Sequence, residues 1–437
     1  MGIPFFFVTL IKAHKNIVTR VRTKLAPTIL CMDFNAFIHT AINDESPIES
    51  VIHELSKFVN EVCEPTTLYI AMDGLVPYGK IVQQRYRRFR ISEPGVFDRN
   101  QISPGTPYMK ELEQAIRSKF PNAIISSTEV PGEGEHKIFN WLKTMPPSAD
   151  VYVYGLDADL ILLSLCYGNG VKLLRENQAF GGKISEGYSV LSIHALAGVL
   201  PIPAHRYVAL CVLCFGNDFM PAIGMFSLRE GGHERALECY LQAGSPDLMT
   251  AAGRQDFLRT AATQEMKVYQ QKVGARENPA ERAILSTDSS HFEERYNLHL
   301  LDGVTDTQSL VHSFWKTFHW TLHYFCENEC LDWNWVYPYA EAPLVSQLVR
   351  YEEISTQWTS PAPKFTITKQ LQFILPQRSL RATHKRVVFP DECYNEETDT
   401  RIPWMRRHQW ECEPRISLPA FSSEELTSVQ SFQPSET

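Results

Sequence analysis

Short apolar runs alternate with amphipathic stretches through the first 175 or so residues of the chain. Five of these runs are short and rich in β-branched and aromatic residues, which predicts strands. They cover residues 28–33, 67–72, 123–127, 151–155 and 171–174. Intervening stretches such as 49–62 and 107–119 predict helices. This alternation is typical of a three-layer α/β/α domain with a mostly parallel central sheet.

The pattern changes after residue 200. A long apolar helix is predicted near 206–215, followed by the motif GNDFMP (216–221) and a second helix near 231–243. From 308 the chain becomes aromatic, since seven of its eight tryptophans lie at 315 or later. The helical periodicity of this stretch predicts a buried face made of Val311, Phe314, Trp315, Phe318 and Leu322. We therefore predict four segments: the α/β domain, a linker with some helix, a mainly helical region and a disordered tail. Their expected bounds are 1–243, 244–305, 306–421 and 422–437.

Composition excludes some classes of protein. The chain has 437 residues and a formal net charge of −8, which argues against a nonspecific basic coat for nucleic acid. A focused basic patch remains open, because residues 74–92 hold five cations and no acid. No apolar run reaches about 18 residues, so no membrane span is predicted. Irregularly spaced cysteines suggest a reducing compartment, with the cytoplasm as the default location and the nucleus as an alternative.

Seven carboxylates fall where a parallel sheet would bring them together. They are Asp33, Asp73, Glu133, Glu135, Asp157, Asp159 and Asp218. Parallel α/β sheets bind ligands beyond the carboxyl ends of their strands, and converging acids repel one another unless cations neutralise them. Taken singly, each acid could be a helix cap or a solvated loop residue. Together they predict a phosphodiesterase site holding two Mg²⁺ or Mn²⁺ ions.

A second group of residues follows Asp73. If the chain is helical after Pro77, one face of that helix carries an amide and three cations, which would suit a phosphate. These residues are Lys80, Gln84, Arg87 and Arg88. An isolated run of this kind would more often be a solvated basic helix, but its place beside a metal-site acid favours phosphate. His39 could stack on a nucleobase or be an ordinary core histidine.

These motifs together resemble the Xrn family of 5′→3′ exoribonucleases, relatives of the flap nucleases with the PIN-like fold. The resemblance rests on several motifs in the family's order: MGIP, CMDFNAFIH, the DG…K…QQR.RRFR block, SPGTPYM, PGEGEHKI, GLDADLI and GNDFMP. WTLHYF…DWNWVYPY and RISLPAF resemble the family's second conserved region. Phe5 departs from the pattern, because the family usually has lysine there.

The resemblance implies a role for each group. The seven acids would hold the metal ions, the residues on the predicted helix face would bind a 5′-terminal phosphate, and His39 would stack on the first base. The expected substrate is single-stranded RNA with a 5′-monophosphate, degraded processively by a monomer. A tryptophan would stack on the base opposite His39, and the choice among Trp320, Trp333 and Trp335 stays open. A flap-type DNA nuclease and a catalytically dead RNA-binding scaffold are the alternatives.

Overall fold

The computed structural model describes most of the chain. The described residues are 2–89, 97–147, 150–168, 170–177, 187–271, 284–286, 288–354 and 357–383, together with the backbone of β8 (Glu397–Asp399) and β9 (Arg415–Ser417), which pair antiparallel. The predicted tail at 422–437 lies outside the described residues, as does the RISLPAF motif apart from the backbone of β9.

A seven-stranded sheet forms the centre of the first half of the chain, in the order β1-β7-β6-β5-β2-β3-β4. Its strands are β1 (Val18–Arg20), β2 (Ile29–Asp33), β3 (Thr67–Ala71), β4 (Ile124–Ser126), β5 (Val151–Tyr154), β6 (Lys172–Glu176) and β7 (Tyr188–Ser192). Neighbours from β6 through β4 are parallel, and β7 is antiparallel to both β6 and β1. The five predicted strands are confirmed, whereas β1 and β7 were not predicted.

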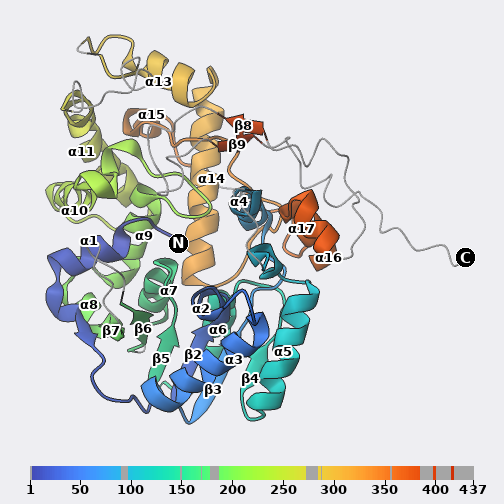
Figure 1. Ribbon diagram of the computed structural model, residues 1–437. Helices are drawn as coiled ribbons and strands as arrows, with labels where there is room; N and C mark the ends of the chain where they lie inside the picture. Colours follow the sequence, from blue (N-terminus) through green and yellow to red (C-terminus); the bar gives the residue numbers. More distant parts are fainter. Residues whose placement is uncertain are drawn as a thin grey trace, which may run out of the picture.

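Helices cover both faces of the sheet, as Figure 1 shows. Leu30 and Met32 of β2 point into one apolar cluster, and Ile29 and Cys31 point into another, as strand geometry requires. The first cluster includes residues of α2 (Phe34–Ala41), α3 (Pro47–Lys57) and α5 (Pro107–Lys119). The second includes residues of α1 (Phe6–Ala13), α6 (Gly134–Leu142), α7 (Asp159–Tyr167), α8 (Ile193–Val199) and α9 (Ala204–Phe215). The predicted three-layer α/β architecture is confirmed.

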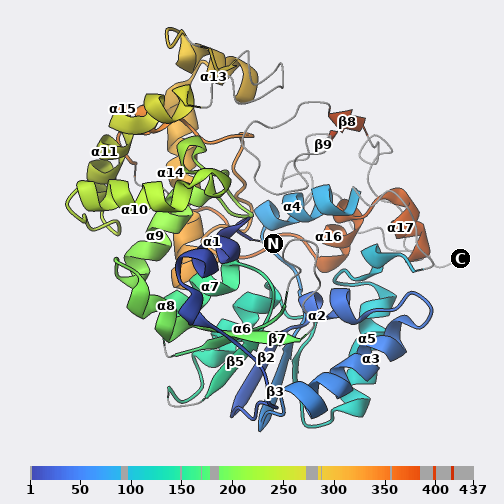
Figure 2. The same cartoon turned by 60° about the vertical axis from the view of Figure 1, so that its left-hand side comes forward.

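The second half of the described chain is mainly helical. Its helices are α10 (Gly232–Gln242), α11 (Ala251–Gln270), α13 (Phe292–Leu300), α14 (Thr307–Cys326), α15 (Val345–Arg350), α16 (Ile367–Ile374) and α17 (Gln377–Ala382). The long helix α14 lies along α7 and α9 (Figures 1 and 2). Its residues Phe314, Phe318 and Leu322 join the same cluster as α9, so helical periodicity predicted its buried face correctly.

The residues predicted as a linker contain α11, whose Phe257 and Leu258 also belong to that cluster. The segment bounds at 243, 305 and 421 stay predictions. Within the described part of the chain no single helix meets the length and hydropathy of a membrane span; only α8 and α9 do so jointly, across an 85° bend.

Candidate active site

Four acids lie beyond the ends of four adjacent strands. Asp33 is the last residue of β2, and Asp73 and Asp157 follow β3 and β5 closely. Glu133 lies on the connection from β4 to α6, immediately before the helix begins. Since β4, β3, β2 and β5 are parallel neighbours, their carboxyl ends lie at one edge of the sheet. The acids are therefore gathered by sheet topology.

A cavity of about 290 Å³ opens at this edge. Five of the seven predicted acids line it: Asp33, Asp73, Glu133, Glu135 and Asp157. All five residues predicted to bind the substrate line it as well: His39, Lys80, Gln84, Arg87 and Arg88. The structure thus brings together ten side chains that the sequence assigned to one site.

The two remaining acids lie next to the cavity. Asp218 Oδ2 is 2.7 Å from Lys80 Nζ, and Asp159 begins α7 with its side chain buried. Asp218 and Asp159 are close enough to repel each other, since Asp218 is the main charged neighbour that raises the pKa of Asp159. Asp159 and Asp218 therefore interact electrostatically with the acids that line the cavity, among them Glu133 and Glu135.

Gly134 allows the acids to approach one another. Its backbone N–H donates a hydrogen bond to Asp73 Oδ1 at 2.8 Å. A Cβ atom at this position would lie 3.2 Å from Asp33 Oδ1 and 3.5 Å from Asp73 Oδ1. The glycine between Glu133 and Glu135 thus leaves room for two carboxylates from neighbouring strands.

The turn that carries Asp218 has a local cause. Helix α9 ends at Phe215 and is followed by Gly216, which has φ 68°, a conformation that glycine adopts without strain. The Asn217 side chain then accepts hydrogen bonds from the Phe219 and Met220 N–H groups at 2.9 and 3.3 Å. These bonds fix the turn in GNDFMP and aim Asp218 at Lys80.

Helix α4 (Tyr78–Phe89) forms the basic wall of the cavity. It begins directly after Pro77, as predicted, and the face bearing Gln84, Arg87 and Arg88 lines the cavity. Its other face carries Ile81 and Phe89, which are buried in an apolar cluster with residues of α16 and α17. The helix is therefore amphipathic in an unusual sense, because its polar face points to a cavity instead of to bulk solvent.

Burial and mutual repulsion perturb the acids. Burial, followed by the charge of Asp73, raises the pKa of Asp33 to about 7. Burial, followed by the charge of Asp218, raises the pKa of Asp159 to about 7. Glu135 is raised well above its usual pKa by burial and by Asp159 and Glu133. Buried acids in this arrangement favour a bound cation, because a cation would remove the repulsion.

Lys80 lies between the acids and the basic wall. Its Nζ atom is 2.5 Å from Glu133 Oε2 and 2.7 Å from Asp218 Oδ2, and all three side chains are buried. Burial alone would lower the pKa of Lys80, but the two carboxylates raise it well above its usual value. Lys80 is therefore a permanent cation that can neutralise either carboxylates or a phosphate.

His39 and Arg88 have the states that the predicted roles need. Burial and the neighbouring Arg88 and Arg87 lower the pKa of His39 to about 3, so its ring is neutral at physiological pH. Burial lowers the pKa of Arg88 to about 10, which still leaves it charged. The buried Nε of Arg88, Oε1 of Gln84 and Oδ1 of Asp159 have no hydrogen-bond partner among the residues that the structure describes. Buried polar atoms without partners are costly, so they favour a polar ligand.

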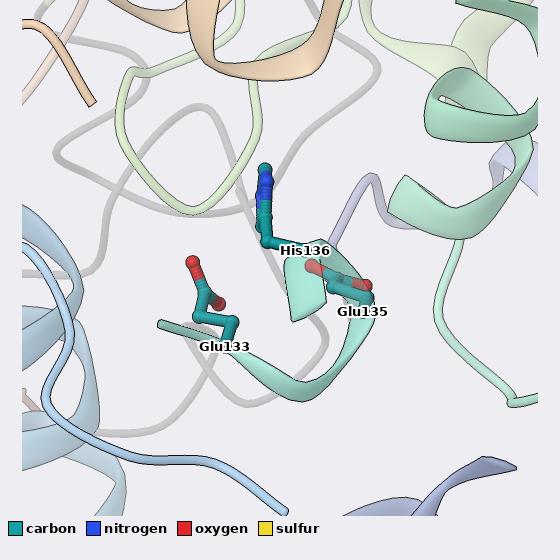
Figure 3. Close-up of side chains that lie close together, drawn as sticks. All are labelled: Glu133, Glu135 and His136. Carbon is teal, nitrogen blue, oxygen red and sulfur yellow. The ribbon is translucent and has the colours of Figure 1, made fainter. Parts of the chain in front are cut away.

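Residues that the sequence had not assigned support the acids from the helical half of the chain. The Tyr324 hydroxyl of α14 donates to Glu133 Oε1 at 2.9 Å, and its ring stacks on His136 with centroids 3.7 Å apart. The Asn328 side chain makes two hydrogen bonds with His136. Its Oδ1 bonds the Nδ1 atom of the His136 ring, and its amide Nδ2 donates to the His136 backbone carbonyl at 2.7 Å. Figure 3 shows Glu133, Glu135 and His136 close together at the start of α6. Their potential ligand atoms lie within 4.8 Å of one another.

The structure narrows the choice of stacking tryptophan. Trp320 is buried against Phe219 and Tyr324, and its Nε1 donates to the carbonyl of Asp332 at 2.9 Å, so it is a packing residue. Trp333 and Trp335 are partly buried. Neither lines the 290 Å³ cavity as the structure describes it. That Trp333 or Trp335 stacks on the substrate base opposite His39 stays a prediction.

Stability should depend on pH through these acids. Because Asp33 and Asp159 have folded pKa values of about 7 against 3.8 ordinarily, the folded state holds protons between these values that the unfolded state releases. The free energy of unfolding should therefore fall as pH rises from about 4 to about 7, on the order of 3 kcal/mol per carboxyl, and level off above pH 7. Thermal unfolding in a chelator measures this slope. Asp33→Asn should flatten it, and an equally steep slope in that variant would contradict the assignment.

Two family models match stretches of this chain. A model described as the XRN 5′-3′ exonuclease N-terminus matches residues 1–95 and 91–177, and one described as the Xrn1 helical domain matches residues 288–387. Together the matches cover more than half of the chain. The 5′-3′ exoribonuclease 1 of Saccharomyces cerevisiae is 28% identical over 316 residues, covering 56% of this chain and 21% of that protein. The 5′-3′ exoribonuclease 2 of Yarrowia lipolytica is 27% identical over 340 residues, covering 55% and 34%.

The chain thus spans about a fifth to a third of the length of these two relatives. Among solved structures, the catalytic core of Rad2 in complex with DNA substrate covers 73% of this chain and 98% of its own, at 16% identity and a TM-score of 0.39. That similarity is too low to bear on substrate or mechanism. The two family models, which match both halves of the chain in the expected order, show that this protein belongs to the Xrn 5′→3′ exonuclease family.

Proposed function

We propose that this protein is a metal-dependent 5′→3′ exoribonuclease that removes mononucleotides from single-stranded RNA with a 5′-monophosphate. The observation that carries the proposal is the division of one cavity into two walls. One wall consists of carboxylates, and the other presents Gln84, Arg87, Arg88 and a neutral His39. A substrate that fits both walls has a terminal phosphate next to a phosphodiester.

The acid wall fits hard divalent cations such as Mg²⁺ or Mn²⁺. Its donors are carboxylate oxygens, which these ions prefer, and burial followed by the charge of a neighbouring acid raises the pKa values of Asp33 and Asp159. We assign the seven predicted acids as the ligands of two ions. Bound there, such ions would activate water and neutralise charge on the scissile phosphate. Tyr324 would hold Glu133 Oε1 in place, and Glu133 Oε2, which is paired with Lys80, would turn from Lys80 to a bound cation.

The basic wall would hold the end of the strand. Arg87 and Arg88 offer forked donors for phosphate oxygens, and Gln84 offers an amide. Lys80 lies where the two walls meet. Its Nζ atom is within 2.7 Å of carboxylate oxygens of both Glu133 and Asp218, so its positive charge can neutralise either these acids or a bound phosphate. The neutral ring of His39 can stack on the first base without placing a further cation beside the arginines.

The helical half of the chain restricts access to the cavity. Besides Tyr324, the Gln370 side chain of α16 accepts from Val76 N–H at 2.9 Å and donates to the Gly74 carbonyl at 3.2 Å. These contacts hold helical elements on the loop that follows Asp73. A cavity of about 290 Å³ is near the lower bound of ligand sites (~300–1,000 Å³). That size favours a single-stranded end over a duplex.

A decay assay tests the proposal. RNAs labelled at the 3′ end and bearing 5′-monophosphate, hydroxyl, triphosphate or cap are incubated with the protein and Mg²⁺, and product sizes are recorded. We expect mononucleotides, with fastest decay of the monophosphorylated RNA. Preferential cleavage of a matched DNA flap would support the flap-nuclease alternative. RNA binding without turnover in Mg²⁺ or Mn²⁺ would support the scaffold alternative.

A further inference from the structure

Two cysteines from distant parts of the chain meet behind the active site. Cys166 lies in the last turn of α7 and Cys326 is the last residue of α14, and their Sγ atoms are 3.1 Å apart. A disulfide bond is about 2.05 Å long, so a movement on the order of 1 Å would join them. The pair links the α/β half of the chain to the helical half.

These sulfurs do not belong to a zinc site within the described residues. The motifs CVLC (211–214) and CENEC (326–330) could be proposed from sequence as halves of such a site. Zinc sites use at least three protein ligands. In the described part of the chain, the group of three or more potential ligands that lies close together is Glu133, Glu135 and His136, which contains no cysteine. Cys166 and Cys326 are therefore a dithiol.

Small molecules can reach the pair. Both cysteines are half-buried and line a cavity of about 260 Å³ together with Leu163 and Phe325. Cys326 also lines a second cavity of about 440 Å³, next to His323 and Trp358. Cys326 thus lines two cavities and Cys166 lines one.

The two sulfurs lie in segments that also carry active-site groups. Helix α7 begins with Asp159 and ends beside Cys166. On the other side, Cys326 lies between Tyr324, which donates to Glu133 Oε1, and Asn328, which bonds His136. A covalent bond between the sulfurs would therefore act on the contacts that hold Glu133 and His136.

We propose that Cys166 and Cys326 are a modification site, at which a low-molecular-weight disulfide such as oxidised glutathione produces a reversible intramolecular disulfide. Cys326 loses its proton and attacks the reagent, forming a mixed disulfide and releasing one glutathione thiol. Cys166 then attacks the Cys326 sulfur and releases the second. Two protein thiols are oxidised, one reagent disulfide is reduced, and the two protons leave with the glutathione.

The order of these steps follows from the surroundings of Cys166. Its hydrogen bond with Cys326, followed by burial, raises the pKa of the Cys166 thiol, so it stays protonated at neutral pH until its partner has reacted. Bond formation draws the ends of α7 and α14 together and displaces Tyr324 from Glu133. If the proposed function is correct, turnover falls several-fold in the oxidised protein and returns on reduction.

Peptide mapping of the whole chain tests the modification. The protein is treated with oxidised glutathione, blocked and digested with trypsin and a glutamate-specific protease, because Glu327 and Glu329 separate Cys326 from Cys330. We expect a peptide that joins Cys166 to Cys326 and that dithiothreitol releases. Cys330→Ser, four residues away in the same motif, is the matched control and should keep this peptide. Cys166→Ser and Cys326→Ser should lose it.

Two outcomes would overturn the proposal. One is the absence of the joined peptide in the folded wild-type protein after oxidation, and the other is its appearance with a different pair of cysteines. An activity arm tests the effect on the site separately. Turnover should fall on oxidation in wild type and Cys330→Ser but not in Cys326→Ser, and a joined protein with unchanged turnover would contradict the coupling. If the reduced protein has no nuclease activity at all, the proposed function is contradicted. The peptide map would then still decide whether Cys166 and Cys326 form a disulfide.

Discussion

Replacing Asp159 with asparagine should reduce RNA turnover by on the order of 1,000-fold or more, with RNA binding largely retained. Asp159 is buried at the start of α7 and is repelled by Asp218, so its carboxylate is poised for a cation. The amide keeps the shape of the side chain but removes its charge. RNA binding depends chiefly on α4 and His39, on the other wall, and should change little. Single-turnover decay and fluorescence anisotropy measure the two quantities.

The matched control for this variant is Asp150→Asn. Asp150 immediately precedes β5 and therefore lies at the opposite end of this strand from Asp157. Its side chain is exposed, and its Oδ1 atom is 2.7 Å from Lys172 Nζ. Its replacement should leave turnover unchanged. Asp157→Asn should behave like Asp159→Asn. Full activity in either active-site variant would contradict the metal assignment.

Replacing Arg88 with alanine should lower the preference for 5′-monophosphorylated over 5′-hydroxylated RNA by about 10- to 100-fold, which removes most of it. Arg88 lies on the cavity face of α4 and donates one bond to the Ile102 carbonyl at 3.0 Å, while its buried Nε has no partner in the described part of the chain. The loss should appear in kcat/KM for the monophosphorylated RNA. The rate for the hydroxylated RNA should change much less, because it offers this residue no terminal phosphate.

Arg117→Ala is the matched control, since it removes the same charge from the surface of α5, where Arg117 pairs with Glu113 at 2.8 Å. Equal preference for the monophosphate in Arg88→Ala and wild type would show that the terminal phosphate binds elsewhere. Equal loss in both variants would indicate a general electrostatic effect. A circular dichroism spectrum like that of wild type would establish that the Arg88 variant is folded.

Much of the site could be predicted because local sequence rules determine it. Short apolar runs form parallel strands, and a parallel sheet brings the residues after each run to one edge, which is why Asp33, Asp73 and Asp157 meet. Helix α4 was predictable because Pro77 fixes its start and the 3.6-residue period fixes its faces. In each case the relevant neighbours are close in sequence or are positioned by the strand order.

Contacts between distant segments could not be predicted in this way. The periodicity of α14 correctly gave its buried face, but it could not show that the Tyr324 hydroxyl meets Glu133. The ion pairs of Lys80 with Glu133 and Asp218 likewise depend on three separate segments. Strand β1 was missed because three residues, two of them exposed, carry too little pattern to distinguish a strand from a loop.

Titration of the metal-free protein with Mn²⁺, followed by calorimetry, tests the central claim most directly. The acid wall predicts two bound ions per chain in the wild type, with at least one of them lost in Asp159→Asn and both retained in Asp150→Asn. Absence of Mn²⁺ binding to the folded wild-type protein, or unaltered binding in the Asp159 variant, would contradict a metal centre built from these seven carboxylates.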